Sequence, residues 1–258
     1  MSMLTLSVVS HGHARMLERL LRQLDEQPSL AGVRVVVTLN LGDESFEVPD
    51  CRRLAVVILR NAEPRGFGAN HNAAFLHCGT PWFAVLNPDL ALDAGEPFTQ
   101  LMHSGSEAGH VGVVAPRIVN AAGKTEDSVR ANLTPWSLAA RQLLGRRKPL
   151  AVDGIARQGQ SFFWLAGMCL LLNAAAFRAV GGFDERFFLY CEDYDLCARL
   201  YNANYALKLE PQARIVHEAQ RDSHRSLRHL RWHLASLAKV WTSAAFWRVT
   251  LGSMSPQS

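Results

Sequence analysis

A stretch of twenty residues, 181 to 200, combines a glycine turn, aromatic rings and five carboxylates, and it leads into an amphipathic helix. The carboxylates belong to Asp184, Glu185, Glu192, Asp193 and Asp195. Such a surface suits a carbohydrate, because the apolar face of a sugar ring stacks on aromatic rings while its hydroxyls hydrogen-bond to carboxylates. The composition of this stretch therefore predicts a sugar-binding surface.

Three of these acids, Glu192, Asp193 and Asp195, fall in the first turn of the predicted helix. Acids in a first turn often only complement the helix dipole. Three together also repel one another, which raises their pKa values while the helix N-terminus lowers them. The alternative is a catalytic role, in which these opposing effects on the pKa values leave one ionised carboxylate able to accept a proton from a hydroxyl.

Asn87-Pro88-Asp89 directly follows the apolar run Trp82 to Leu86. A carboxylate at the end of a strand can hold a divalent cation that bridges the phosphates of a nucleotide. Asn-Pro-Asp is also an ordinary turn sequence, so both interpretations stay open. His217, at the end of a short strand, is either a packing residue or an imidazole that completes a metal site with Asp89.

The segment Arg65-Gly66-Phe67-Gly68-Ala69-Asn70-His71-Asn72 follows another apolar run and opens a helix. Glycines let a backbone approach a ligand closely, and helix N-terminal amides favour phosphate oxygens. The GxGxxG fingerprint of dinucleotide sites is absent, so a plain glycine-rich helix entry is the alternative. The side-chain amides of Asn70 and Asn72 favour ligand contact.

The elements that must position these residues follow from the hydrophobic pattern. Strands are predicted at 4–9, 33–39, 54–59 and 82–86, a helix before Gln27-Pro28, and another helix from about Gly68. Strands that are apolar throughout and alternate with helices indicate a parallel sheet covered on both faces. Ligands of such sheets bind at the carboxyl ends of the strands, which here are the loops around Ser10, Asn40, Asn61 and Asn87.

The second half of the chain has a weaker pattern. From about Arg117 to Gln160 the periodicity fades, and we expect an insertion or mobile loop. Beyond it, a strand pair at 162–172, a short helix at 174–180, the acidic helix, and short strands at 205–209 and 214–216 are predicted.

Composition excludes several classes of protein. The chain has 258 residues, 48% hydrophobic and 19% charged, which suits a folded α/β domain rather than a disordered protein. No apolar run is long enough to span a membrane, and the first residues lack the pattern of a signal peptide, so we expect a cytoplasmic protein. The five cysteines include no CxxC pair, which favours reduced thiols over disulfides or zinc.

The C-terminal region, 221–258, alternates basic residues with leucines at helical spacing from Leu227 to Leu237. A solvated helix packed on the sheet is one interpretation, and binding to anionic lipid headgroups or a lipid diphosphate is the other. Trp232, Trp241, Phe246 and Trp247 favour a membrane interface. No nucleic-acid recognition motif accompanies the charge, so we expect no nucleic-acid partner.

These motifs, in this order, resemble the family 2 inverting glycosyltransferases of the GT-A fold. Val8-Val9-Ser10, the segment 65–72, Leu86-Asn87-Pro88-Asp89 and the block 181–200 match the family's motifs, the third as a variant of its metal-binding DxD. The resemblance covers about residues 4 to 240. Val8 to His13, Tyr190 to Asp193 and Arg231 to Leu234 look closer still to the bacterial O-antigen rhamnosyltransferases.

The resemblance implies a GT-A-type α/β fold, with a mostly parallel central sheet, helices on both faces and a C-terminal acceptor-side extension. It implies Asp193 as the catalytic base and a divalent cation, Mg²⁺ or Mn²⁺, held by Asp89 and His217. The residues assigned to the donor are Ser10, His11, Asn40, Arg65, Gly66, Gly68, Asn70, Asn72, Asn87 and Asp89. Those assigned to the acceptor are Trp164, Gly167, Glu192, Arg221 and Arg225. Many family members have an aspartate after the second strand, whereas this chain has Asn40.

The expected organisation is a nucleotide-sugar-binding half at 1–116, an acceptor-binding and catalytic half at 117–220, and the basic helical region at 221–258. The expected reaction transfers L-rhamnose from dTDP-L-rhamnose to a hydroxyl of a polyprenyl-diphosphate-linked GlcNAc or another cell-surface glycan. We expect the protein to lie on the cytoplasmic face of the bacterial inner membrane. The alternatives are a UDP- or GDP-sugar-dependent transferase, a non-catalytic sugar-binding partner, or a basic nucleic-acid- or membrane-binding module.

Overall fold

The structure is a computed structural model that describes residues 2–92, 95–143, 154–158, 160–218 and 227–252. Its strands are β1 (Leu4–Ser10), β2 (Arg34–Leu39), β3 (Ala55–Arg60), β4 (Trp82–Leu86), β5 (Leu90–Leu92), β6 (Val111–Val119), β7 (Val129–Ala131), β8 (Ile155–Ala156), β9 (Phe163–Leu165), β10 (Cys169–Asn173) and β11 (Ala206–His217). Its helices are α1 (Ala14–Glu26), α2 (Phe67–Phe75), α3 (Pro97–Glu107), α4 (Pro135–Leu143), α5 (Ala174–Ala179), α6 (Glu192–Asn202), α7 (Leu227–Thr242) and α8 (Ala244–Gly252), with a 3₁₀ turn at Pro28–Leu30.

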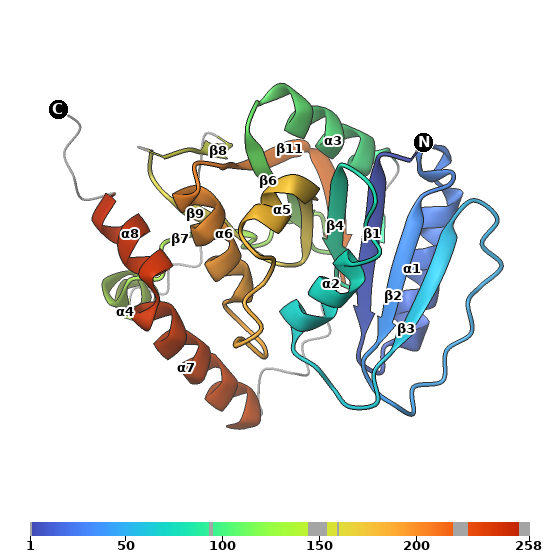
Figure 1. Ribbon diagram of the computed structural model, residues 1–258, viewed down its shortest axis with the longest axis horizontal. Coiled ribbons are helices and arrows are strands. Elements are labelled where there is room, and N and C mark those ends of the chain that lie inside the picture. The colour runs from blue at the N-terminus through green and yellow to red at the C-terminus, as the bar shows by residue number, and fades with distance from the viewer. Residues whose placement is uncertain (1, 93–94, 144–153, 159, 219–226, 253–258) are drawn as a thin grey trace.

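One large sheet forms the centre of the molecule, with the strand order β3-β2-β1-β4-β10-β6-β11-β5 (Figure 1). β1 to β4 are parallel neighbours, and β10 runs antiparallel between β4 and β6. Because the first four strands are parallel, their carboxyl ends meet at one edge of the sheet. The loops after Ser10, Leu39, Arg60 and Leu86 therefore lie together, as the sequence predicts.

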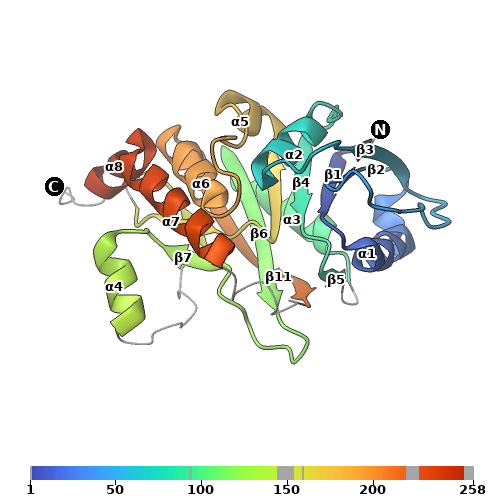
Figure 2. The same cartoon turned by 90° about the horizontal axis from the view of Figure 1, so that it is seen from below.

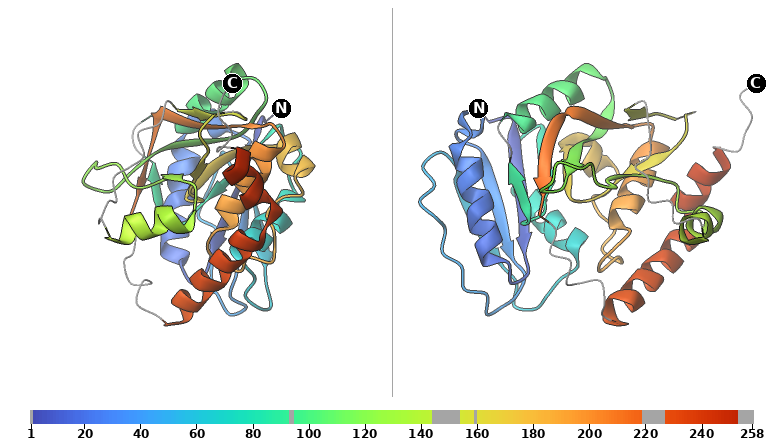
Figure 3. Two further views of the ribbon diagram at one scale, coloured as in Figure 1. Left: turned by 90° about the vertical axis from the view of Figure 1, so that its left-hand side faces the viewer. Right: turned by 180° about the vertical axis from the view of Figure 1, so that it is seen from behind.

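The alternation of side chains along each strand divides the interior into two cores. In β1, Leu4, Leu6 and Val8 face the side covered by α1 and α3. In β4, Phe83 and Val85 face the opposite side, where α2, α5 and α6 pack. The front and rear views show α1 and α2 on opposite faces of the sheet (Figures 1 and 3). Helices thus cover both faces, and the fold agrees with the GT-A-type expectation.

A second, two-stranded sheet of β7 and β9 lies beyond α6, next to α4, α7 and α8 (Figure 2). The indole of Trp241 in α7 donates a hydrogen bond to Leu133 O, 2.9 Å away, and Asn132 donates to Thr250 of α8. These contacts attach the segment before α4 to the C-terminal helices. The described part of 117–160 is therefore not simply an insertion or mobile loop. Residues 117–119 form the end of β6, and β7, α4 and β8 follow them along the chain.

Two further sequence expectations need correction. The two short strands predicted at 205–209 and 214–216 form one long strand, β11, with an irregularity between Glu210 and Arg214. The expected boundary at 116 falls inside β6, which pairs along its length with β11. All five cysteines are free, as predicted. A membrane-spanning helix, which needs about 20 apolar residues, is absent from the described part of the chain.

Candidate active site

Asparagines tie the ends of the first three strands together. The Asn61 side-chain amide donates to Asn40 Oδ1 at 2.8 Å and to Asn70 Oδ1 at 2.7 Å. Asn40 in turn donates to the carbonyl of Arg65 at 2.9 Å and accepts from its backbone N–H. Asn70 is buried, so its amide orients the Arg65 loop rather than facing solvent. This network fixes the loop that follows β3 at the carboxyl edge of the sheet.

Glu44 is a carboxylate that sequence reasoning missed at this edge. It is 9% exposed, its Oε1 accepts a short hydrogen bond from Ser10 Oγ, and its buried Oε2 has no hydrogen-bond partner among the described residues. Asn40 lies directly at the end of β2, whereas Glu44 returns to the edge through a turn. No periodic signal marks that return, because the residues after β2 are irregular. A carboxylate thus lies near the end of β2, where Asn40 itself carries an amide.

The glycines of the segment 65–72 serve a close contact between two parts of the chain. A Cβ on Gly66 would lie 2.9 Å from the Phe188 carbonyl oxygen, and one on Gly68 would lie 2.6 Å from Phe183 Cβ. Phe67 N–H donates to Phe188 O at 2.9 Å. The close approach that these glycines permit is therefore to residues 183–188, and contact with a donor stays a prediction.

Asn72 is placed differently from the expectation of a donor contact. Its amide donates to Phe183 O and Glu185, and its Oδ1 accepts from Phe183 N–H at 2.9 Å. These bonds engage both ends of the amide, so Asn72 anchors the turn after Gly182. Helical spacing alone could not reveal this, because Asn70 and Asn72 leave α2 in different directions.

Asp89 and His217 lie side by side, as the sequence predicts. His217 Nε2 is 3.2 Å from Asp89 Oδ2, while His217 Nδ1 is 2.7 Å from an oxygen of Glu126. Burial lowers the pKa of His217, but the hydrogen bonds and charges of Asp89 and Glu126 outweigh it and raise that pKa overall. Glu126 is the second residue that sequence reasoning missed, since it belongs to the segment without periodicity.

Within the described residues, no three His, Cys, Asp or Glu side chains form a metal-binding cluster. The group at Asp89 nevertheless fits a divalent cation. Asp89 Oδ1 is buried and has no hydrogen-bond partner in the part of the chain that the structure describes, and a carboxylate that holds the far nitrogen of an imidazole is typical of metal-ligating histidines. Cations such as Mg²⁺ often take one or two carboxylates and complete their shell with substrate phosphates.

The turn Ala166-Gly167-Met168 connects this edge to the acidic helix. Asn87 N–H donates to Met168 O at 3.0 Å, and Gly167 N–H donates to Asp193 Oδ2 at 2.9 Å. Consecutive Cα atoms are about 3.8 Å apart. One turn therefore holds Asn87, which precedes Asp89 by two residues, and Asp193, at the start of α6.

Asp193 and Glu192 are neighbouring carboxyl groups in different environments. Asp193 is partly exposed, and its oxygens accept from Gly167 N–H and, at 2.8 Å, from Tyr194 N–H. Burial raises the pKa of Asp193, while those N–H donors and the charge of Arg130 oppose the rise. Glu192 is 6% exposed, and burial together with the charge of Asp193 raises its pKa to about 8. The N–H donors and the charge of Arg130 therefore favour ionisation of Asp193 over that of the more deeply buried Glu192.

Arg130 is a further residue that sequence reasoning missed. It faces Trp164 across the β7–β9 pair, with its guanidinium 5.0 Å from the ring centroid. Trp164 is 3% exposed, and its indole N–H donates to Ala131 O at 2.9 Å. Trp164 thus supports Arg130 rather than offering a free ring face, and its direct contact with an acceptor stays a prediction.

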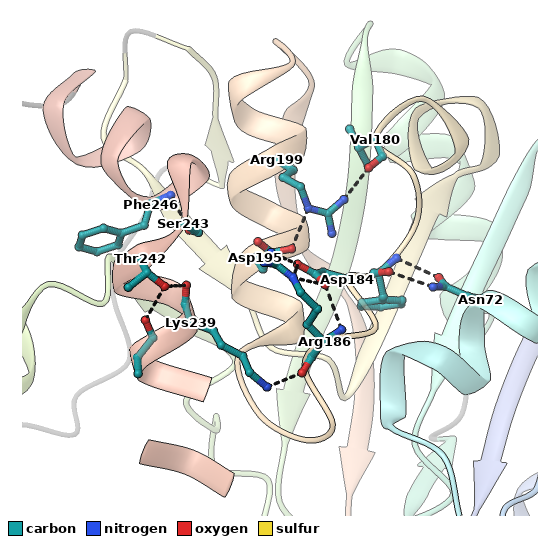
Figure 4. Close-up of polar contacts among 12 residues, drawn as sticks. Asn72, Val180, Asp184, Arg186, Asp195, Arg199, Lys239, Thr242, Ser243 and Phe246 are labelled. Atoms are coloured by element: carbon teal, nitrogen blue, oxygen red, sulfur yellow. Dashed lines mark hydrogen bonds and ion pairs between the residues drawn. The ribbon is translucent and has the colours of Figure 1, made fainter. Parts of the chain in front are cut away.

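Two other acids of the block, Asp184 and Asp195, form ion pairs away from this pair. Asp195 is 2.7 Å from Arg199 Nε, and Asp184 pairs with Arg186. They line a cleft of about 470 Å³ between α6 and the junction of α7 and α8 (Figure 4). Neither Glu192 nor Asp193 lines it, so these ion pairs stabilise the turn and the helix rather than that carboxyl pair.

Three predicted site residues remain. His11 is exposed at the carboxyl edge, and its Nδ1 is 3.3 Å from the Asn40 amide. Arg221 and Arg225, predicted for the acceptor, lie outside the described residues.

Comparison with known proteins agrees with this geometry. Residues 150–256 match the family model described as glycosyl transferase family group 2. The rhamnosyltransferase WbbL of Escherichia coli is 26% identical over 242 residues, which cover 91% of this chain and 90% of that protein. The chain is a glycosyltransferase that resembles the family 2 enzymes.

Another relative of this glycosyltransferase is the N-acetylglucosaminyl-diphospho-decaprenol L-rhamnosyltransferase of Mycobacterium tuberculosis. It is 30% identical over 153 residues, which cover 53% of this chain and 46% of the relative, so the match spans less than half of that protein. Among solved structures, the mannosyltransferase PcManGT from Pyrobaculum calidifontis, in complex with GDP-Man and Mn²⁺, superposes with a TM-score of 0.63 at 16% identity. That match covers 97% of this chain and 68% of the other, and it supports the fold.

Proposed function

We propose that this chain is an inverting transferase that moves L-rhamnose from dTDP-L-rhamnose to a hydroxyl of a polyprenyl-diphosphate-linked GlcNAc. The observation that carries the proposal is the shared turn at Gly167-Met168, which holds the carboxyl group of Asp193 beside the Asn87-Pro88-Asp89 corner. A base and a diphosphate-binding edge at one turn suit a reaction between two substrates.

The chemistry is a single displacement. Asp193 accepts the proton of the acceptor hydroxyl while that oxygen forms a bond to the anomeric carbon. The bond between the anomeric carbon and the diphosphate oxygen breaks on the opposite face, so the configuration inverts and the nucleoside diphosphate leaves. Two backbone N–H groups hold Asp193 in place, from Gly167 and Tyr194. Glu192, protonated at neutral pH, leaves Asp193 as the base of the pair.

A divalent cation would be held by Asp89, through its buried Oδ1, with His217 as a second ligand oriented by Glu126. When bound, such an ion neutralises the charge of the departing diphosphate. Asn87 takes the place of the first acid of DxD, and its backbone N–H donates a hydrogen bond to Met168 O. The protein ligands of the cation would therefore be the Asp89 carboxylate and the His217 imidazole beside it.

The donor nucleotide would lie along the carboxyl ends of β1, β2 and β3. Glu44 Oε2 offers a buried acceptor there, which suits the N–H of a pyrimidine base or a sugar hydroxyl. Ser10 holds Glu44, and Asn40 and Arg65 form the adjoining wall. The similarity to rhamnosyltransferases supports dTDP-L-rhamnose as the donor.

The acceptor side supports attachment to an anionic membrane surface. Leu230 and Leu234 of α7 are 53% and 57% exposed, and Trp247 and Leu251 of α8 are 51% and 58% exposed. Trp136 of neighbouring α4 is 83% exposed. Large apolar side chains one turn apart on a basic helix suit the headgroup region of a bilayer. The location we propose is the cytoplasmic face of the bacterial inner membrane, where a lipid-diphosphate acceptor would be presented.

This membrane-facing surface differs from the one predicted by sequence. Phe246 is 2% exposed, Trp241 donates its N–H to Leu133, and Trp232 packs 5.0 Å from Phe188, so of the four aromatics only Trp247 is mostly exposed. The leucines also divide: Leu237 is buried while Leu230 and Leu234 face outward. The apolar surface thus includes residues that the helical pattern assigns to the core.

The function is tested by mass spectrometry of products from dTDP-, UDP- and GDP-sugars offered with a lipid-diphosphate GlcNAc. A product heavier by one deoxyhexose, formed with dTDP-L-rhamnose, is the expected result. Transfer from UDP-sugars alone would overturn the rhamnose assignment, and release of free sugar without any acceptor product would overturn the proposed acceptor.

A further inference from the structure

Two adjacent residues directly before the catalytic pair have left-handed backbone conformations. Tyr190 has φ of 73° and Cys191 has φ of 64°. L-residues with side chains adopt this region rarely, because Cβ crowds the following carbonyl oxygen. Two in succession persist only when the surroundings hold them. Cys191 is also the residue that caps α6, so its conformation sets where Glu192 and Asp193 begin.

One face of α7 lies along this segment and contacts it repeatedly. His229 Nδ1 is 2.8 Å from the Tyr190 hydroxyl, and the Trp232 and Phe188 rings are 5.0 Å apart. Ser236, which is 2% exposed, donates its hydroxyl to Leu189 O at 2.9 Å. Lys239 donates to Arg186 O through a short bond (Figure 4).

The spacing of these contacts explains why they share a face. Positions 229, 232, 236 and 239 recur at intervals of three and four residues, which is one side of an α-helix. The same segment also contacts the glycine-containing segment 65–72, where Gly66 approaches the Phe188 backbone. The segment 186–191 is therefore enclosed between the segment 65–72 and α7.

We propose that His229 and Ser236 are positioning residues for the catalytic carboxylate. They hold Leu189 and Tyr190 so that the left-handed pair is retained, and this keeps Asp193 against Gly167 N–H. The inference rests on the proposed function for its kinetic consequence, but the positioning itself is a property of the fold. Without the contacts from α7, the backbone relaxes and Asp193 leaves the Gly167 amide.

The test uses the double variant Tyr190→Phe/Ser236→Ala, which removes both hydroxyls and keeps the tyrosine ring. We expect kcat to fall by about ten- to a hundredfold while the KM for donor changes by less than about twofold, because small displacements of a base are costly. Hydrogen exchange at the Gly167 amide should become at least about tenfold faster, since its acceptor moves. Thr242→Val is the matched control, because the bonds of the Thr242 hydroxyl to described residues lie within α7, to Ala238 and Lys239.

Glycine at position 191 supplies the decisive rescue. Glycine adopts positive φ without strain, so adding Cys191→Gly to the double variant should restore kcat and Gly167 protection by at least about fivefold. Unchanged Gly167 exchange in a folded double variant would overturn the proposal, and so would a loss that Cys191→Gly does not reverse. If the wild-type protein transfers no sugar, the proposed function fails, while the exchange measurement still decides the positioning role.

Discussion

Replacing Glu192 by glutamine should remove a pH-dependent loss of stability that the buried carboxyl imposes on the protein. Glu192 is 6% exposed, and its buried Oε2 has no hydrogen-bond partner within the described ranges of the chain. Burial, followed by the charge of Asp193, raises the pKa of Glu192 from its ordinary 4.5 to about 8. Glutamine keeps the shape of the side chain and does not ionise.

The direction in which stability changes with pH depends on whether the folded or the unfolded chain keeps the Glu192 proton. Below pH 4.5 Glu192 is protonated in both the folded and the unfolded chain. Between pH 4.5 and about 8 only the unfolded chain releases the proton, so stability falls as the pH rises. At about 1.4 kcal/mol per pKa unit, the rise is worth about 5 kcal/mol, and that stability is lost by about pH 8.

The assay is urea unfolding of the wild type and Glu192→Gln at intervals between about pH 5 and 9. The free energy of unfolding of the variant should exceed that of the wild type by an amount that grows with pH toward about 5 kcal/mol. Glu47→Gln is the control, because Glu47 is exposed and far from Asp193 in sequence. Parallel curves for the wild type and Glu192→Gln would refute the reasoning that Glu192 is protonated in the folded state.

Three further outcomes are expected. Asp89→Ala should lower transfer at least about 100-fold and weaken Mn²⁺ binding measured calorimetrically with dTDP; full activity of the variant or in EDTA would contradict the metal role. Glu44→Gln should raise the KM for the nucleotide-sugar about tenfold with little change in kcat, since it removes one charged hydrogen-bond acceptor, and an unchanged KM would exclude that contact. Leu234→Gln with Trp247→Gln should reduce sedimentation with vesicles of anionic phospholipid by about tenfold, and equal sedimentation would count against this surface.

The first half of the sheet could be predicted because its strands are rich in apolar residues. Residues 82–86 are apolar throughout, residues 4–9 include only the small polar residues Thr5 and Ser7, and the ends of the two strands place Ser10 and Asn87 at one edge. β6 was not predicted, although it is apolar, because Gly112 and Pro116 interrupt its pattern. β11 was predicted as two strands because Pro211 and its polar neighbours mark an irregularity that tertiary pairing bridges.

The site residues that sequence could not reveal come from irregular segments. Glu44 bonds to Ser10 across 34 positions, and Glu126 bonds to His217 across 91. No periodicity predicts a contact between such distant residues. Asn72 shows that residue type alone is also insufficient. An asparagine there suits a ligand, but its side chain leaves α2 toward Phe183 and accepts a hydrogen bond from the Phe183 N–H. Motif order located the region of the site, and packing decided which side chains face it.

The central claim is that Asp193 is the base for glycosyl transfer, and single-turnover measurement with Asp193→Asn tests it most directly. Asparagine keeps an oxygen for one of the backbone N–H groups but does not take up the proton, so we expect transfer to fall by about 10²- to 10⁴-fold. Asp50→Asn, an exposed substitution, should transfer at the wild-type rate. Transfer by folded Asp193→Asn at the wild-type rate would contradict the account.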